Sequence, residues 1–302
     1  MKFDFQTIPS QKGRVAIVTG SNVGLGYETA LGLIKKEVKV ILACRNAAKA
    51  AQAKEDLLKE VPQAIIEIIL IDLSSLNSVR NFATSFLEQH DRLDLLINNA
   101  GLLMTKYVET EDGLELQLAT NYLGHFLLTG LLLPTLLKTE DSRIVSLASL
   151  AHRQGVINFD DLQGKKKFSG FKAYAQSKLA CLMYGYELQR RLDAAGHQQN
   201  IYTIAHPGVS VTSVGRNLPK LAQWLTTIFE PIFTHKPDKG ALPTLWAALG
   251  PAEGGDYYGP TRWMQIKGSP GKVGSTKRSK DKATAKRLWE VSEELTGFKY
   301  SF

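Results

Sequence analysis

The sequence predicts a single α/β domain built on a doubly wound, mostly parallel sheet with helices on both faces. Short runs rich in Val, Ile and Leu alternate with helix-period segments as far as Ala205. The first four runs are nearly continuous in apolar residues, as expected of parallel strands covered on both faces. This order requires crossover helices and places ligands at the carboxyl ends of the strands. The predicted strands are Arg14–Thr19, Val38–Ala43, Ile65–Ile71, Leu93–Ile97, Arg143–Leu147 and Ile201–Ala205.

Composition is that of an ordinary globular chain. The 302 residues can bury a sizeable core, and 44% are hydrophobic and 22% charged. The net charge of +8 is spread along the chain and is dense only in Lys267–Arg287, which we interpret as a solvated face and not a nucleic-acid site. No apolar stretch approaches the ~20 residues that span a bilayer, and the N-terminus lacks a secretory signal. We therefore expect a cytoplasmic protein with two reduced cysteines, Cys44 and Cys181.

No internal repeat or linker divides the chain, so we expect one domain over residues 1–302. Gly164–Lys167 and Gly268–Lys282 have the composition of exposed loops or turns. Leu218–Phe233 differs, because its apolar residues fall on one helix face and Pro219 suits a first helical turn. Three interpretations stay open for this segment: a lid over an apolar substrate pocket, a packing helix, or a membrane-surface contact.

A glycine-rich turn follows the first predicted strand and leads into a helix from Tyr27 to about Lys36. Glycine permits a tight turn and lets the backbone approach a pyrophosphate, and free N–H groups at a helix start attract anions. Three glycines alone are a weak signal, but their place at the first strand–helix turn favours a dinucleotide site. The predicted contacts are Gly20, Ser21, Asn22, Gly24, Leu25 and Gly26.

Polar or small residues also follow the next three strands. Arg45 stands where a ribose 2′-hydroxyl would call for Asp or Glu, so a 2′-phosphate and hence NADP is favoured over NAD. Asp72 and Leu73 follow the third strand, and Asn98-Asn99-Ala100-Gly101 follow the fourth. Each signal alone could be a turn, and their weight comes from lying at one edge of the sheet.

The chemical groups centre on Tyr174 and Lys178, which a spacing of four places on one helix face. A nearby cation favours the charged form of a phenol, so this pair suits proton transfer. Ser149 follows the fifth strand and could hydrogen-bond a carbonyl oxygen, while Asn121 lies in an earlier helix and could anchor a water chain. Alone, the Tyr-Lys spacing occurs by chance in many helices.

Together these motifs resemble the short-chain dehydrogenase/reductase family, a Rossmann-type fold, from roughly Arg14 to Tyr258. The resemblance implies a catalytic tetrad of Asn121, Ser149, Tyr174 and Lys178, with the last two also contacting the cofactor. It further implies cofactor contacts at Asp72, Leu73, Asn98, Ala100, Gly101, Pro207, Gly208, Val209 and Thr212. Residues 14–150 would then be mainly nucleotide-binding, and 151–302 would hold the catalytic helix, substrate loop and C-terminal extension.

Within that family, Leu150-Ala151-His152 after the serine looks most like the retinol dehydrogenase and protochlorophyllide reductase branch. This implies an NADP(H)-dependent oxidoreductase acting on an apolar carbonyl or alcohol that is retinal-, steroid- or aromatic-ketone-like. Two alternatives remain: reduction of a C=C bond in a pigment-like substrate, or a non-catalytic NADP-binding regulatory protein. We expect a homodimer or monomer and no metal, since His125, His152 and His206 lack ligand spacing and suit core or loop positions.

Overall fold

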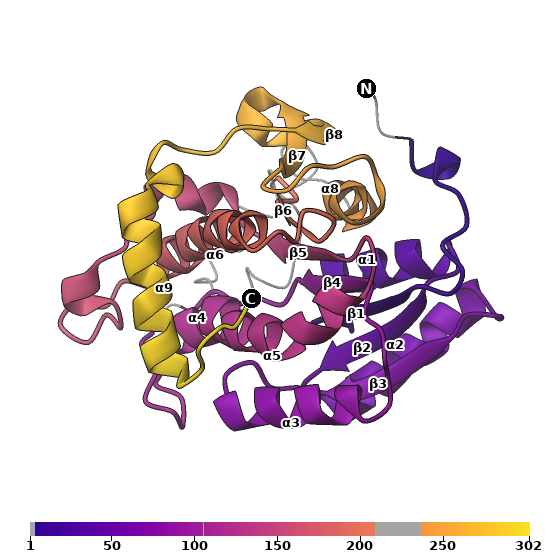
Figure 1. The fold of residues 1–302 in the computed structure, drawn as a ribbon, viewed down its shortest axis with the longest axis horizontal. Helices are drawn as coiled ribbons and strands as arrows, with labels where there is room; N and C mark the ends of the chain where they lie inside the picture. Colours follow the sequence, from indigo (N-terminus) through magenta and orange to yellow (C-terminus); the bar gives the residue numbers. More distant parts are fainter. Residues whose placement is uncertain (1–3, 105, 209–236) are drawn as a thin grey trace, which may run out of the picture.

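The computed structural model describes residues 4–104, 106–208 and 237–302. They form one continuous eight-stranded sheet in the order β3-β2-β1-β4-β5-β6-β7-β8 (Figure 1). All neighbouring strands pair in parallel except β7 and β8, which are antiparallel. The strands are β1 Val15–Thr19, β2 Lys39–Cys44, β3 Ile66–Leu70, β4 Leu95–Asn98, β5 Arg143–Leu147, β6 Ile201–Ala205, β7 Tyr257–Arg262 and β8 Lys267–Lys272.

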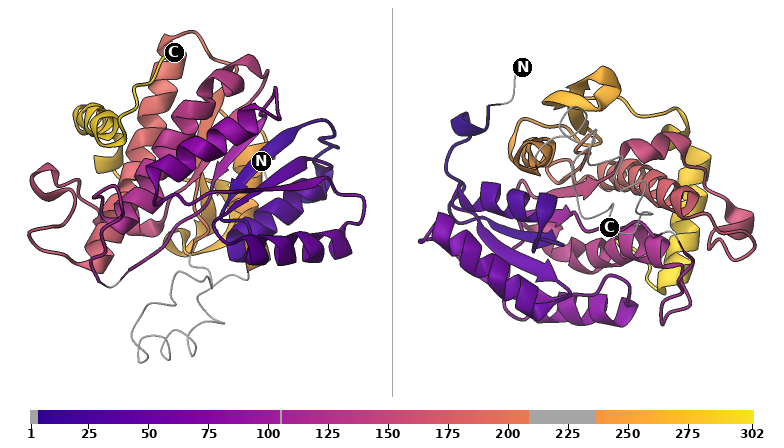
Figure 2. Two further views of the ribbon diagram at one scale, coloured as in Figure 1. Left: turned by 90° about the horizontal axis from the view of Figure 1, so that it is seen from below. Right: turned by 180° about the vertical axis from the view of Figure 1, so that it is seen from behind.

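Helices cover both faces of this sheet, which gives a Rossmann-type three-layer fold (Figure 2). One face carries α1 (Gly24–Ile34), α2 (Ala47–Glu60) and α8 (Pro237–Leu249). The other carries α3 (Leu76–Leu87), α4 (Leu116–Leu118), α5 (Gly124–Lys138), α6 (Gly170–Ala194) and α9 (Lys282–Thr296). No helix within these described ranges is long and apolar enough to cross a membrane.

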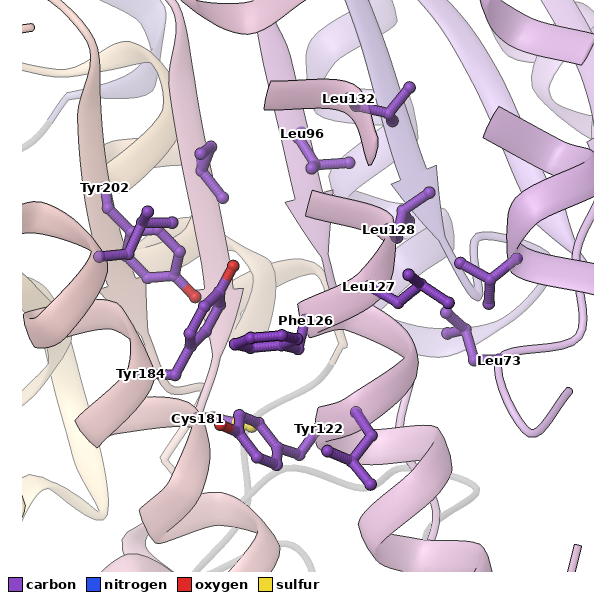
Figure 3. Close-up of a cluster of buried hydrophobic side chains, with 14 of the residues drawn as sticks. Leu73, Leu96, Tyr122, Phe126, Leu127, Leu128, Leu132, Cys181, Tyr184 and Tyr202 are labelled. Atoms are coloured by element: carbon purple, nitrogen blue, oxygen red, sulfur yellow. The ribbon is translucent and has the colours of Figure 1, made fainter. Parts of the chain in front are cut away.

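An aromatic cluster fixes α5 and α6 against the sheet (Figure 3). The Phe126 ring on α5 lies 5.2 Å from Tyr184 on α6, and Tyr184 lies 5.5 Å from Tyr202 on β6. Trp289 on α9 closes the cluster 5.2 Å from Phe126. Rings in tilted or edge contact bury large apolar areas in defined orientations. These contacts fix the position of α6, which carries Tyr174 and Lys178, and of α5, which directly follows the segment that holds Asn121.

The N-terminus of α1 lacks the side-chain cap that α2, α3 and α9 have. Asn46, Ser75 and Asp281 each cap the first turn of their helix through a side-chain oxygen. The N-cap of α1 is Val23, which offers no such oxygen. The first backbone N–H groups of α1 therefore donate no hydrogen bond to an N-cap side chain and are left for another acceptor.

The six predicted strands are confirmed, each within one or two residues at its ends. The prediction of exposed loops at Gly268–Lys282 is wrong for its first part, because Gly268–Lys272 belongs to β8. This strand has no β-branched residue and is specified by antiparallel backbone pairing with β7, including Gly259 with Gly271. The solvated face predicted for Lys267–Arg287 also holds only in part, since Ser279 and Ala285 are buried.

Asn121 does not lie in a regular α-helix. The chain forms a π-helical segment over Ala119–Leu123, between α4 and α5. Such segments change the direction of backbone groups and occur frequently at functional sites. Both cysteines are free and buried, as predicted.

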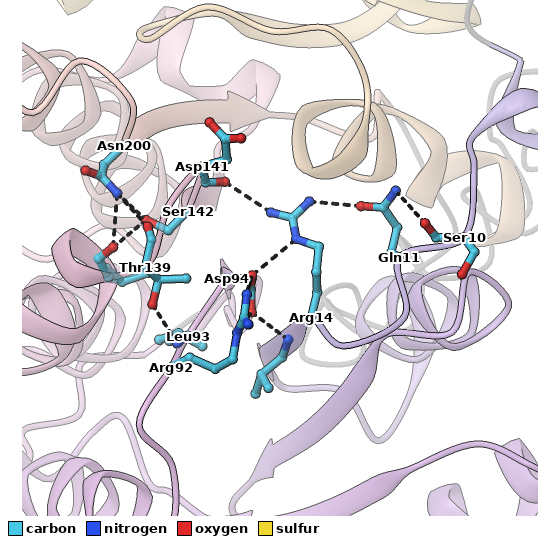
Figure 4. Close-up of polar contacts among 12 residues, drawn as sticks. Ser10, Gln11, Arg14, Arg92, Leu93, Asp94, Thr139, Asp141, Ser142 and Asn200 are labelled. Atoms are coloured by element: carbon cyan, nitrogen blue, oxygen red, sulfur yellow. Dashed lines mark hydrogen bonds and ion pairs between the residues drawn. The ribbon is translucent and has the colours of Figure 1, made fainter.

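At the amino ends of the strands, a polar cluster ties several segments together (Figure 4). Asp94 is 1% exposed and accepts hydrogen bonds from the Val15 backbone at 2.8 Å and from Arg92, with Arg14 3.5 Å away. Asn200 donates to the Leu136 and Thr139 carbonyls and to Ser142. The buried carboxylate of Asp94 and the buried amide of Asn200 thus both have hydrogen-bond partners, as expected where polar groups stabilise the fold.

Candidate active site

A cavity of about 330 Å³ lies at the opposite edge, where β1 to β4 end. Its walls come from the turns that follow these four strands, as the sequence predicted from their polar and small residues. It is lined by Gly20, Asn22, Val23, Gly24, Leu25, Gly26, Ala43, Cys44, Arg45, Ile71, Asp72, Leu73, Asn99, Ala100, Gly101, Leu102 and Thr120.

The glycine turn has the close packing that a phosphate cradle requires. Gly20 and Gly24 adopt φ of 65° and 58°, a region that favours glycine. A Cβ at Gly26 would lie only 2.3 Å from the Gly20 carbonyl oxygen and 2.5 Å from the Asn99 amide nitrogen. The turn thus brings the uncapped N-terminus of α1 to the cavity, where its N–H groups suit an anion.

Arg45 and Asp72 stand together at the far wall. The Arg45 guanidinium lies 3.6 Å from the Asp72 carboxylate, and 70% of the Arg45 side chain is exposed. Asp72 also accepts hydrogen bonds from the backbone and hydroxyl of Ser74 at 2.9 and 2.6 Å. Arg45 therefore presents a cation to the cavity mouth from a position that Asp72 orients.

Two predicted contacts have their side chains elsewhere. Ser21 is buried, with its oxygen 3.4 Å from the Cys44 sulfur. Asn98 donates to Thr129 at 3.0 Å and does not line this cavity. Its neighbour Asn99 does, and binds the Thr19 carbonyl at 2.7 Å. The sequence analysis did not select Asn99, although it stands in the same four-residue motif.

Lys178 lies between the cavity and the end of β5. This lysine is 4% exposed and donates to the Leu147 carbonyl at 2.9 Å, two residues before Ser149. Its ammonium would be 3.2 Å from a Cβ at Gly101, a cavity-lining position. It also lies 5.9 Å from the centroid of the Tyr174 ring, one turn earlier on α6. A buried cation therefore stands between the cavity wall and the phenol.

Ser149 is held by a short 3-10 turn, η3 (Leu150–Gln154), of which it is the N-cap. Its hydroxyl oxygen accepts the Ala151 N–H at 3.2 Å. Its own hydroxyl proton is then free to point toward a substrate oxygen. The turn packs against α6, which carries Tyr174.

Asn121 binds the loop at the cavity wall through both ends of its amide. Its oxygen accepts the Leu102 N–H at 2.8 Å, and its nitrogen donates to the Leu102 carbonyl and the Ser177 hydroxyl, both at 3.0 Å. Ser177 in turn donates to the Tyr174 carbonyl at 2.8 Å. Ser177 therefore links Asn121 to the backbone of Tyr174, and it was not among the predicted site residues. The only hint of this role in the sequence is that a polar residue stands between Tyr174 and Lys178.

His125 links this region to the glycine turn. Its Nδ1 donates to the Asn121 carbonyl at 3.2 Å, and its Nε2 lies 2.9 Å from the Thr19 hydroxyl. Thr19 accepts the backbone N–H groups of Asn99 and Ala100. Burial lowers the pKa of His125 to about 3, with the Lys178 charge acting in the same direction and the Asn121 bond against it. His125 is thus a neutral core residue, as expected from its lack of ligand spacing.

Of the loop after β6, the structure describes Pro207 and Gly208. Gly208 has φ 74°, and a Cβ there would lie 2.3 Å from the Ile266 carbonyl oxygen. The predicted contacts Val209 and Thr212 and the segment Leu218–Phe233 lie outside the described residues. Among the described residues, no group of His, Cys, Asp and Glu side chains could hold a metal ion.

This combination of fold and site is matched by one family. A family model described as short chain dehydrogenase matches residues 14–223, more than half of the chain. The protein therefore belongs to the short-chain dehydrogenase family and is an oxidoreductase.

Within the family the chain falls in the retinol dehydrogenase branch. Retinol dehydrogenase 12 of Mus musculus is 38% identical over 293 residues, which are 95% of this chain and 88% of that protein. Retinol dehydrogenase 13 of Homo sapiens is 39% identical over 296 residues, which are 96% and 86% of the two chains.

Two solved structures extend this likeness to the fold. An uncharacterized protein from Mycobacterium paratuberculosis has a TM-score of 0.83 and 36% identity, and each chain is fully covered. The RhlG/NADP active-site complex of Pseudomonas aeruginosa has a TM-score of 0.65 and 25% identity over 82% of this chain and 94% of that one.

Proposed function

We propose that this protein is an NADP(H)-dependent oxidoreductase that interconverts an apolar carbonyl compound and its alcohol. The observation that carries the proposal is the position of Lys178, between the nucleotide-sized cavity, the Tyr174 ring and the end of β5 that leads to Ser149. A cation, a phenol and a hydroxyl beside such a cavity are the groups that carbonyl reduction needs.

The cavity fits a dinucleotide on its own geometry. The glycine turn leaves no room for a Cβ at Gly26 and presents an uncapped helix N-terminus, which suits a pyrophosphate. Asp72 and Leu73 would contact the adenosine half, and Ala100 and Gly101 the wall toward the nicotinamide. The expected contacts of Asn98, Pro207, Gly208, Val209 and Thr212 with the cofactor remain predictions.

Preference for NADP over NAD rests on Arg45. Its exposed guanidinium at the end of β2 can bind a 2′-phosphate through two nitrogens. The paired Asp72 orients this fork. The complex of RhlG with NADP supports the same choice of cofactor by similarity.

A nicotinamide nucleotide, when bound, supplies or accepts the hydride. Ser149 would donate a hydrogen bond from its hydroxyl to the substrate oxygen, because its own oxygen already accepts the Ala151 N–H. Tyr174 would give that oxygen a proton, and Lys178 would stabilise the phenolate left behind. Asn121 would hold the Leu102 loop and, through Ser177, the backbone of Tyr174.

The relatives named retinol dehydrogenases support an apolar substrate, since retinol is a long apolar alcohol. We propose a retinal-, steroid- or aromatic-ketone-like compound. The cytoplasmic location, the homodimeric or monomeric state and the division of roles between residues 14–150 and 151–302 stay predictions. For Leu218–Phe233 the lid, the packing helix and the membrane-surface contact all stay open.

Titration of the purified protein with NADPH and NADH tests the cofactor assignment. We expect tighter binding of NADPH, and loss of roughly tenfold or more of that preference in Arg45→Ala because a charge-assisted fork is removed. Lys49→Ala is a matched control, since this exposed cation on α2 does not line the cavity. Equal binding of both nucleotides by the wild type would contradict the NADP assignment.

A further inference from the structure

Four buried polar side-chain atoms behind Ser149 have no hydrogen-bond partner among the described residues. They are His152 Nε2, His206 Nε2, the Tyr257 hydroxyl and Gln265 Oε1. The His152 and His206 rings both pack on Tyr257, with centroids 5.9 and 5.1 Å from it, and the Gln265 side chain faces His206. Folded proteins leave few such atoms unpaired, so a group of four in one place requires a physical reason.

The proton of His152 is fixed by its neighbour. His152 Nδ1 lies 2.6 Å from the Ser149 carbonyl oxygen, which can only accept a hydrogen bond. Nδ1 must therefore carry the proton, and a neutral ring then leaves Nε2 as a bare acceptor. The same carbonyl also accepts the His152 backbone N–H at 3.1 Å. His152 thus holds the backbone of the predicted catalytic serine.

His206 has the opposite tautomer. Its Nδ1 lies 3.1 Å from the Gly208 backbone N–H, which can only donate. Nδ1 is therefore bare, and the proton of the neutral ring is on Nε2. That nitrogen points at Gly259 of β7, where a Cβ would be 2.0 Å away. A glycine in the strand makes room for this imidazole.

The four atoms are balanced in hydrogen-bonding type. His206 Nε2–H and the Tyr257 hydroxyl can donate, while His152 Nε2 and Gln265 Oε1 can accept. Donors and acceptors are therefore equal in number among the four atoms. Protonation of His152 upsets this balance because its Nε2 becomes a donor, whereas protonation of His206 removes the Nδ1 acceptor of the Gly208 N–H.

Both rings are neutral for electrostatic reasons. Burial lowers the pKa of His206 to about 3, with His152 and the Arg153 charge acting in the same direction and Gln265 against them. Burial also lowers the pKa of His152, where the Ser149 bond opposes it and Arg153 reinforces it. Tyr257 faces the same Arg153 and also Tyr186.

The Gln265 oxygen reaches this cluster through an unusual turn. Trp263, Met264 and Gln265 all have positive φ, at 49°, 54° and 70°. Three such residues in succession without glycine are strained and persist only where their surroundings hold them. Arg153 donates to the Met264 carbonyl at 3.1 Å, and the Gln265 amide donates to Gly274. The turn is therefore tied to η3, the segment that follows Ser149.

From these contacts we infer that His152 and His206 are positioning residues, a pair of neutral imidazoles in opposite tautomers. Together with Tyr257 they fix the Ser149 turn relative to the loop that starts at Pro207. The Ser149 hydroxyl is thereby held in place for the substrate oxygen. This role rests on the proposed function, whereas the assignment of tautomers does not.

The tautomers are measured directly by long-range 1H–15N correlation of the imidazole rings in the wild-type protein, with resonances assigned by triple-resonance experiments. We expect His152 to carry its proton on Nδ1 and His206 on Nε2, and the His206 ring not to titrate between pH 8 and 5.5. If both rings have the same tautomer, or if either titrates near 6.5, the pair as described does not exist.

Two variants separate positioning from packing. His152→Asn keeps an N–H that can reach the Ser149 carbonyl but loses the ring, and His152→Phe keeps the ring volume against Tyr257 but loses the donor. We expect kcat for carbonyl reduction to fall about tenfold or more in the Phe variant and to recover mostly in the Asn variant. The KM for NADPH should change less than twofold in both.

Better activity of the Phe variant than of the Asn variant would overturn the positioning role, because packing alone would then explain His152. Absence of turnover in the wild type on every carbonyl tried would instead refute the proposed function. The ring tautomers measured in that same protein would still decide whether the pair is present. If either variant is unfolded by circular dichroism, the tautomers of the wild type still decide the proposal.

Discussion

The two edges of the sheet are built in opposite ways. At the amino ends of the strands, Asp94 and Asn200 engage their polar atoms with backbone and side-chain partners. At the carboxyl ends, buried polar atoms of Asn98, Thr120, His152 and His206 have no hydrogen-bond partner among the residues that the structure describes, and the glycine turn has positive φ values. The amino edge thus has its polar groups paired within the protein, whereas unused hydrogen-bonding capacity lies at the carboxyl edge, where ligands bind.

The largest effect on the free energy of unfolding should come from removing the Asp94 carboxylate at the amino ends of the strands. Asp94→Ala leaves the buried Val15 N–H without an acceptor and removes the ion pair with Arg92, so we expect a loss of about 2 to 3 kcal/mol in the free energy of unfolding. Urea titration measures it. Asp141→Asn is the control, since only the backbone of Asp141 binds Arg14, and it should cost less than about 0.5 kcal/mol.

NADPH affinity of the folded Asp94→Ala protein should match the wild type, because this edge is remote from the cavity. A loss below about 1 kcal/mol would show that the Asp94 cluster is not the structural edge described above.

Lowering the pH should destabilise the folded protein through the buried histidines at the carboxyl ends of the strands. His125 and His206 have folded pKa values of about 3, below the ~6.5 of an unfolded chain, so the unfolded state binds more protons as the pH falls below 6.5. Each histidine should therefore remove about 2 kcal/mol of stability between pH 7 and pH 5.

Urea unfolding at the two pH values measures this loss, and His206→Asn should reduce it by about 2 kcal/mol. Stability that is unchanged between pH 7 and pH 5 would mean that these rings are not held neutral by burial.

A methyl group in the glycine turn should weaken nucleotide binding. Gly26→Ala places a Cβ against the Gly20 carbonyl, which is backbone and cannot move aside cheaply, so we expect NADPH affinity to fall tenfold or more. Gly274→Ala is the matched control, because nothing lies within 4 Å of its Cβ. Calorimetric titration compares them, and equal affinities would argue against the cavity as the nucleotide site.

The sequence was most informative where residue type and position suffice. Apolar runs located β1 to β6, and the turns after β1 to β4 supplied the cavity because parallel strands end at one edge. The strand β8 was missed because Lys267–Lys272 contains two glycines and a proline, and only its pairing with β7 makes it a strand.

Other features depend on contacts between distant segments. The π-helical turn at Asn121 has no local signature, and the choice of Asn99 over Asn98 as a cavity residue depends on which side of β4 each faces. The roles of His152 and His206 arise only when the loops after β5 and β6 meet on Tyr257. Such pairings cannot be derived from spacing along the chain.

In the proposed reaction Tyr174 would transfer a proton to or from the substrate oxygen, while the hydride would pass between nicotinamide and the carbonyl carbon. The most direct test uses NADPH deuterated at the transferred position, with retinal and an aromatic ketone as substrates. The wild type should deliver deuterium to the carbonyl carbon, and Tyr174→Phe should bind NADPH equally but react at least a hundredfold more slowly. Unchanged turnover of the Tyr174→Phe variant would contradict this account.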